Sequence, residues 1–221
     1  MLYPLWTAKP GSGCSTTAVA LATQLSGHER AEVLLVDLGG DLAAALGVND
    51  ATAGVTDWLA AGDATDEALR RVEVPVGAAI KLLPRGSDHS WRADRAEVLV
   101  RLLDHESRPV VIDIGTVGQG HGSPMDQLRL RLAERRHSLL VTRPCYLAMR
   151  RAVALPMRPG GIILIRERGR SLDAFDVADI LGVSIAAQID HDPAVARALD
   201  AGLLVRRCPR LLANQVRGVI R

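Results

Sequence analysis

A glycine-rich segment close to the first residue has the residue types of a phosphate-binding loop. Residues 8–17 read Ala-Lys-Pro-Gly-Ser-Gly-Cys-Ser-Thr-Thr and lie between an apolar strand predicted over 2–7 and a helix predicted over 16–25. In such a turn, consecutive backbone amides and the helix N-terminus hold phosphate oxygens without charged side chains. The residues expected to contact phosphate are Gly11, Ser12, Gly13, Cys14, Ser15 and Thr16.

Two residues of this loop determine which chemistry it can perform. Cys14 stands where a phosphate-binding loop usually has a lysine, and Lys9 stands at the entrance of the loop. A thiol at a helix N-terminus can ionise to a reactive thiolate; the simpler interpretation is a small residue that replaced a dispensable lysine. Lysine is rare in this chain, since Lys9 and Lys81 stand beside 25 arginines, so we expect Lys9 to have a function.

Two strands predicted to be buried end in aspartate. The strand over 33–36 ends at Asp37, and the strand over 109–112 ends at Asp113. Ligands of parallel sheets bind at the carboxyl ends of strands, where a carboxylate can hold Mg²⁺ or its water shell. Asp37 and Asp113 are therefore predicted site residues.

The rest of the sequence alternates apolar strands with helices. Further strands are predicted over 79–83, 138–141, 161–165 and 183–188, and further helices over 42–46, 54–61, 65–72, 92–103, 125–135, 147–155, 172–181 and 193–202. This alternation is typical of a mostly parallel sheet with helices on both faces. We therefore expect an α/β fold in a single domain over 1–221, because 221 residues with 48% hydrophobic composition can bury one core.

Composition favours a cytoplasmic protein. The longest apolar runs have strand length and are too short to span a membrane, and the first residues lack the charge pattern of a secretory signal. The three cysteines are widely spaced, which fits neither a disulfide framework nor a metal cluster.

Taken together, these motifs resemble the ParA/MinD family of deviant Walker P-loop ATPases, whose loop reads Lys-Gly-Gly-x-Gly-Lys-Thr-Thr. The resemblance implies ATP and Mg²⁺ as cofactors, with Ser15 and Asp113 as magnesium ligands. It also implies a homodimer in which Lys9, as the signature lysine, reaches the phosphates bound by the partner. The strand-end sequence around Asp37 is similar to the family's Asp-x-Asp motif.

The resemblance extends over nearly the whole chain. Residues 54–59 and 82–86 are similar to the family's Gly-Leu-x-Asp-x-Leu and Leu-Pro-x-Gly segments. Residues 189–195, which include Asp190 and Pro193, resemble the segment that closes over the adenine. Arg166 stands near the position of the family's base-contacting asparagine.

Three departures from the family indicate a degenerate site. Cys14 cannot supply positive charge to the phosphates, Gly39 cannot orient the attacking water as the second aspartate of the motif does, and Arg166 lacks an amide. Asp41 could substitute for the missing aspartate, although capping of the following helix is the simpler role. We expect hydrolysis to be very slow or absent, so whether the protein is an active enzyme stays open.

Arginine is concentrated in two regions. Residues 129–170 hold eleven arginines against Glu134 and Glu167, which predicts either a nonspecific DNA surface or ordinary solvated helix faces. The tail over 205–221 has five arginines and no acid. Its apolar stripe suits a helix packed on the sheet, which we favour, or an amphipathic helix on a membrane at the inner membrane or cell pole.

The leading hypothesis is a ParA/MinD-like spatial organiser or assembly adaptor that dimerises and binds an unidentified protein partner. Its altered loop is similar to those of the pilus-associated TadZ/CpaE branch. An active ParA-type ATPase that positions DNA or protein cargo is the first alternative. A small ATP-dependent ligase of the dethiobiotin synthetase type is the second, and Cys14 argues against it because those enzymes retain the loop lysine.

Overall fold

The computed structural model describes residues 1–29, 31–49, 53–62, 65–87, 90–92, 94–118 and 122–220. These residues form one eight-stranded sheet with the order β3-β4-β2-β5-β1-β6-β7-β8. The strands are β1 (Leu2–Thr7), β2 (Val33–Asp37), β3 (Val74–Gly77), β4 (Ile80–Leu83), β5 (Val110–Thr116), β6 (Leu139–Thr142), β7 (Gly161–Arg166) and β8 (Ile185–Asp190). All pairings are parallel except that of β3 with β4. The predicted α/β fold with a mostly parallel sheet is confirmed.

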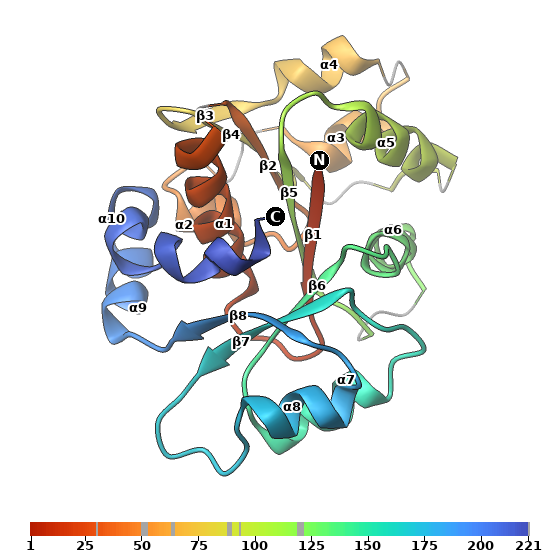
Figure 1. Cartoon of the computed structure of the whole chain (residues 1–221). Helices are drawn as coiled ribbons and strands as arrows, with labels where there is room; N and C mark the ends of the chain where they lie inside the picture. Colours follow the sequence, from red (N-terminus) through yellow and green to blue (C-terminus); the bar gives the residue numbers. More distant parts are fainter. Residues whose placement is uncertain are drawn as a thin grey trace.

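Helices cover both faces of this sheet (Figure 1). They are α1 (Cys14–Glu29), α2 (Leu42–Ala45), α3 (Val55–Ala60), α4 (Asp66–Arg71), α5 (Asp94–His105), α6 (Pro124–Ala133), α7 (Tyr146–Val153), α8 (Ala174–Leu181), α9 (Pro193–Asp200), α10 (Leu204–Leu211) and the 3-10 helix η1 (Ala213–Val219). Alternate residues of a strand point to opposite faces. Val33 and Leu35 of β2 accordingly join the core under α1, and Leu34 and Val36 join the core under α5 and α6.

The strand β3 is absent from the sequence-based expectation. It is a four-residue edge strand in which Pro75 stands among half-buried and exposed residues, antiparallel to β4. Proline lacks an amide for the ladder and is tolerated only at sheet edges, so it weakens the strand pattern in the sequence.

The C-terminal segment packs on α1 as two short helices, α10 and η1. Leu204, Cys208, Leu212 and Val216 are almost fully buried in the core that α1 shares with the sheet. Where we favoured one helix packed on the sheet, the structure has two short helices, which pack on α1 and, through η1, beside β8; Arg221 lies outside the described residues. Because the apolar stripe is buried, it does not form the membrane-facing surface that the alternative requires. No helix in the described part of the chain has the length and apolarity needed to cross a membrane.

Residues 54–57 and 85–87, which are far apart in sequence, are joined by hydrogen bonds. The carboxylate of Asp57 in α3 accepts hydrogen bonds from Gly54 N at 2.8 Å and from Ser87 N at 3.2 Å. Gly86 has a φ of +81°, and a Cβ there would collide with Asp57, so only glycine fits. Thr56 donates its hydroxyl to Arg85 O at 2.9 Å, and Gly54 precedes the helix as the cap.

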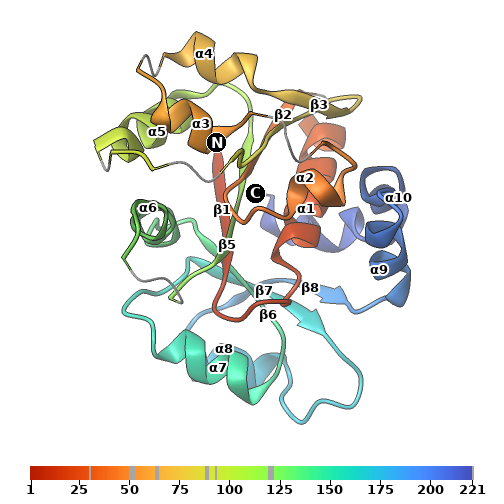
Figure 2. The same ribbon diagram turned by 180° about the vertical axis from the view of Figure 1, so that it is seen from behind.

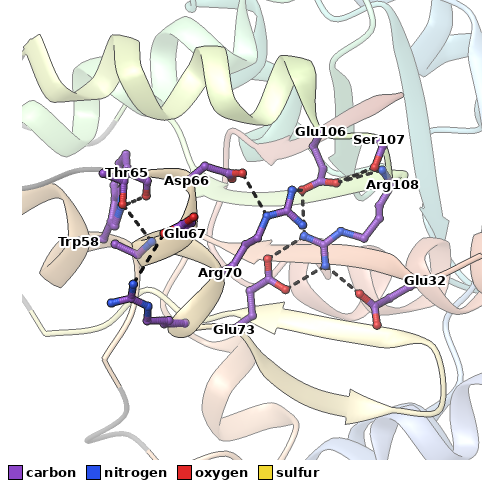
Figure 3. Close-up of polar contacts among 12 residues, drawn as sticks. Glu32, Trp58, Thr65, Asp66, Glu67, Arg70, Glu73, Glu106, Ser107 and Arg108 are labelled. Carbon is purple, nitrogen blue, oxygen red and sulfur yellow. Dashed lines mark hydrogen bonds and ion pairs between the residues drawn. The ribbon is translucent and has the colours of Figure 1, made fainter.

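An ion-pair network is centred on Arg108 (Figure 3). Arg108 and Glu32 precede β5 and β2, so they lie at the opposite ends of these strands from Asp113 and Asp37. Arg108, just before β5, contacts Glu32 at 2.8 Å, Glu73 at 2.7 Å and Glu106 at 2.9 Å. The side chains of Glu73 and Glu106 are only 7% and 6% exposed. The hydrogen bonds that Arg108 donates to Glu73, Glu106 and Glu32 raise the pKa of its guanidinium despite its burial. The network thus ties the loops that enter β2, β3 and β5.

Candidate functional site

The glycine-rich loop joins β1 to α1 and is braced by its own hydroxyl groups. Gly11 and Gly13 have φ values of +73° and +90°, which turn the chain so that α1 begins at Cys14. The Ser12 hydroxyl donates to Lys9 O at 2.7 Å, and the hydroxyls of Thr16 and Thr17 donate to Gly13 O at 2.9 and 2.7 Å. These bonds fix the turned conformation of the loop.

The loop forms the floor of a cavity of about 570 Å³. All six residues predicted to contact phosphate line it: Gly11, Ser12, Gly13, Cys14, Ser15 and Thr16. Asp41 and Asp190 also line it, whereas Lys9, Asp37, Asp113, Arg166 and Pro193 do not. Pro193 instead begins α9, whose cap Asp192 accepts from Ala194 N at 2.8 Å. The adenine-side segment around Asp190 thus shares one cavity with the loop.

Asp37 is fully buried and serves as the cap of α2. Its carboxylate accepts hydrogen bonds from Gly40 N at 2.6 Å and Leu42 N at 3.0 Å. Burial and the charge of Asp113 raise the pKa of Asp37 to about 6. Asp41 stands at the N-cap position but makes no side-chain capping bond, so the capping role expected for Asp41 belongs to Asp37. Asp41 remains free to face the cavity.

Asp113 is fully buried beside Asp37, its partner in the register of β5 and β2. Its Oδ1 accepts from Gly115 N at 3.0 Å, and its Oδ2 has no hydrogen-bond partner among the described residues. Burial raises the pKa of Asp113, while the Ser15 hydroxyl and the Cys14 thiol nearby lower it. An unsatisfied buried carboxylate oxygen beside a hydroxyl at a helix N-terminus offers the hard oxygen ligands that Mg²⁺ prefers. Ser15 and Asp113 therefore fit a magnesium site.

Cys14 is the first residue of α1 and is only 6% exposed. Burial, followed by the charge of Asp113, raises the pKa of its thiol well above the ordinary value. The thiol is therefore neutral at pH 7, which is the opposite of the shift that a reactive thiolate requires. Cys14 places a small uncharged group between the loop and Asp113.

The backbone around Gly39 leaves little room for a side chain. A Cβ on Gly39 would lie 3.3 Å from Asp113 Oδ2, and a Cβ on Gly115 would lie 2.8 Å from the Gly39 Cα. Two arginines hold the same loop from outside: Arg85 donates to Gly39 O at 3.5 Å, and Arg129 donates to Leu38 O. Neither arginine was predicted as a site residue: Arg85 occupies the variable position of the segment over 82–86, and Arg129 lies in α6 outside every motif.

Arg166, predicted near the base-contacting position, pairs with Asp190 at 2.5 Å across the ends of β7 and β8. Both side chains are more than half exposed, and only Asp190 reaches the cavity. Gln215 of η1 accepts from Asp190 N at 2.8 Å, and Leu212 lines the cavity wall. The C-terminal segment therefore contributes to the site, which the sequence did not indicate.

The arginine-rich stretch over 129–170 is partly neutralised by the fold. Six of its eleven arginines form ion pairs with acidic side chains in the described part of the chain. Arg131 and Arg135, for example, pair with Glu97 and Asp104 of α5 at 3.0 and 2.6 Å. The charge available for binding DNA is thus smaller than the sequence count suggests.

The fold is shared with solved structures of ParA/MinD family ATPases. A ParA family ATPase from Chlorobium tepidum TLS matches with a TM-score of 0.76 and 19% identity, covering 97% of this chain and 95% of that one. MinD complexed with Mg-ADP from Pyrococcus horikoshii OT3 matches with a TM-score of 0.78 and 20% identity, covering 99% and 93%. An ATP complex of McdA from Cyanothece matches with a TM-score of 0.68 and 17% identity, covering 99% and 94%.

These identities establish the fold alone. No protein-family model matches the sequence, and no curated protein sequence matches it. The glycine loop, the paired aspartates and the cavity therefore lie in a fold that this chain shares with those structures, and the activity of this chain must be argued from its own residues.

Proposed function

We propose that this protein is a ParA/MinD-like spatial organiser or assembly adaptor with a degenerate nucleotide site, which dimerises and binds partners with little or no ATP hydrolysis. The observation that carries the proposal is Cys14, a buried neutral thiol beside Asp113 at the position of the loop lysine. The altered loop favours the TadZ/CpaE branch, and this finer assignment stays a prediction.

The site lacks two of the charges that phosphate transfer needs. Losing a charge-assisted contact to phosphate costs about 1.5–3 kcal/mol of binding free energy, and losing a donor that acts on the transition state costs about 2.7–4 kcal/mol. Gly39 adds a second loss, because glycine has no carboxylate to orient water, and the neighbouring Asp113 Oδ2 is the oxygen that fits Mg²⁺. Weak nucleotide binding and negligible turnover follow from these losses.

The remaining parts of the site support a nucleotide-gated dimer. Hydrogen bonds fix the turned conformation of the loop, and Ser15 and Asp113 fit Mg²⁺, which would screen the phosphate charge when bound. Lys9 does not line the cavity of its own chain, and it forms no ion pair with any residue that the structure describes. A lysine at the loop entrance whose side chain pairs with no acid among the described residues suits a contact to the phosphates of a second subunit.

The test combines calorimetric titration of ATP and Mg²⁺ with mass in solution for wild type, Cys14→Lys and Lys9→Ala. We expect weak ATP binding by wild type, binding tightened about tenfold or more by Cys14→Lys, and nucleotide-dependent dimers that Lys9→Ala removes. Lys81→Ala is the matched control, because Lys81 is the other lysine and lies in β4. ATP turnover by wild type at ordinary ATPase rates, abolished by Asp113→Ala, would contradict the proposal.

A further inference from the structure

Two neighbouring helices expose aromatic side chains that a monomer would be expected to bury. Phe175 of α8 is 85% exposed and Tyr146 of α7 is 72% exposed. Phe175 is the one phenylalanine of a chain whose aromatic content is 3%. Three further apolar side chains are exposed on these two helices: Leu147, Val153 and Ile180. A cluster of exposed aromatic and aliphatic side chains marks an interaction surface.

The outer sides of α7 and α8 form one surface, which we call the α7/α8 surface. α7 connects β6 to β7 and α8 connects β7 to β8, and these strands are parallel, so the two helices run in the same direction on one face of the sheet. Their inner sides share a small core with β7 that contains Met149 and Val177. Both views show the two helices together at the bottom of the molecule (Figures 1 and 2).

The two helices carry opposite charges on this surface. Arg150 and Arg151 are exposed on α7, which has no acidic residue, and Asp176 and Asp179 are exposed on α8, which has no basic residue. None of these four side chains forms an ion pair within the described ranges of the chain; Asp176 only accepts a hydrogen bond from Asp173 N. Each helix thus presents an apolar surface with a charge that the other helix would complement.

We propose that the α7/α8 surface binds the same surface of a second copy of this chain. A two-fold axis that runs between the helices and parallel to them sets α7 against the partner's α8 at two equivalent places. An axis perpendicular to the helices would instead set arginines against arginines. Charge complementarity therefore selects the first arrangement, in which both basic helices meet acidic helices and the exposed aromatic side chains are buried between them.

This contact is separate from the nucleotide cavity, which lies at the carboxyl ends of the strands. It needs neither nucleotide nor Lys9, so it stands if the proposed nucleotide-gated dimer fails. If both contacts form, each subunit has two different two-fold interfaces, and such subunits build either a closed tetramer or an open filament.

The experiment measures mass in solution without nucleotide over about a hundred-fold range of protein concentration. One variant is Arg150→Glu/Arg151→Glu, and the other is Asp176→Arg/Asp179→Arg, with Asp179→Arg alone as a milder form because Asp176 belongs to the cap of α8. We expect wild type to dimerise and each double variant alone to weaken dimerisation by about a hundred-fold or more, since like charges then face each other. An equimolar mixture of the two double variants restores both contacts, so a heterodimer should form.

Arg206→Glu/Arg207→Glu is the matched control, because it reverses two adjacent exposed arginines on another helix, α10. It should leave the dimer unchanged, and circular dichroism of every variant reports whether the fold is retained. A wild type that stays monomeric at every concentration overturns the proposal. The proposal is also overturned if neither charge reversal weakens dimerisation. It is overturned as well if both variants are folded and their mixture stays monomeric.

Discussion

The neighbouring strands β2 and β5 carry a charged cluster at each end. The two clusters differ in whether their buried charges have partners of opposite charge. At the entry to the strands, Arg108 is surrounded by Glu32, Glu73 and Glu106, so the buried charges have partners. At the exit, Asp37 and Asp113 face each other as two buried acids. The first cluster stabilises the fold, and the second destabilises it, because two buried acids lie together without a base.

This difference indicates where the molecule is prepared for a ligand. Removing a partner from a buried ion pair leaves an uncompensated charge, which is strongly destabilising, whereas a site that already holds an uncompensated charge gains when the charge is neutralised. Substitutions at the entry cluster should therefore lower the free energy of unfolding, and removal of a charge at the exit cluster should raise it.

The largest effect is expected at the entry cluster. Arg108→Ala leaves the buried Glu73 without its basic partner and leaves Glu106 only Arg70 at 3.5 Å. We expect a loss of about 3–5 kcal/mol in the free energy of unfolding, measured by denaturant titration at pH 7. Arg92→Ala is the control, because Arg92 pairs with Asp94 on the surface with both side chains more than half exposed, and it should leave the free energy of unfolding nearly unchanged. Equal effects of the two substitutions would remove the contrast between the clusters.

The entry cluster should also set the acid limit of the fold. Although burial opposes the shift, hydrogen bonds from Arg108 lower the pKa of Glu106 to about 2. A folded-state pKa below the unfolded value means that the stabilisation is complete above about pH 4.5 and is lost as the pH falls towards 2. After allowance for solvent screening, this contribution is about 2 kcal/mol. In Glu106→Gln, the free energy of unfolding should depend less on pH over this acid range. Glu97→Gln, on the surface, should leave that dependence unchanged.

The exit cluster should respond with the opposite sign. Asp113→Asn keeps the acceptor for Gly115 N and removes the buried charge, so in metal-free buffer we expect the free energy of unfolding to rise by about 1–3 kcal/mol. Thermal and denaturant unfolding both measure this change. Destabilisation by Asp113→Asn would show that the carboxylate is already compensated.

The smallest effect is that of the cation itself. Mg²⁺ bound by Ser15 and Asp113 stabilises the folded chain by about 1.4 kcal/mol at ten times its Kd, which is seen as a rise in the melting temperature. The rise should vanish in Asp113→Asn. A rise of the same size in wild type and in Asp113→Asn would place the cation elsewhere.

Local sequence patterns were sufficient for the strand ends and the glycine loop. Asp37 and Asp113 each follow an apolar strand, and parallel pairing then brings them together without further information. The segments over 54–59 and 82–86 were recognised separately, and the structure joins them through Asp57 and Gly86. Their spacing in sequence contains no sign of this contact.

Contacts that depend on tertiary packing could not be predicted. Arg129 reaches Leu38 O across 91 positions, and the charge run that contains it gave no indication which arginines would be paired inside the molecule. Asp37 rather than Asp41 caps α2. Asp37 lies five residues before Leu42 in sequence, but the end of β2 brings its carboxylate within hydrogen-bond distance of Leu42 N. Pro75 made the edge strand β3 difficult to predict, because proline argues against a strand in the sequence, yet the amide that it lacks is not required at a sheet edge.

The packing of α10 and η1 on α1 has a consequence for synthesis of the chain. α1 emerges from the ribosome early, yet Leu204, Cys208 and Val216, which cover its flank, follow about 190 residues later. During that interval the apolar flank of α1 and one wall of the cavity stay open, and such surfaces attract chaperones or aggregate. The cavity of the nascent chain therefore lacks the wall that contains Leu212 until α10 and η1 have docked.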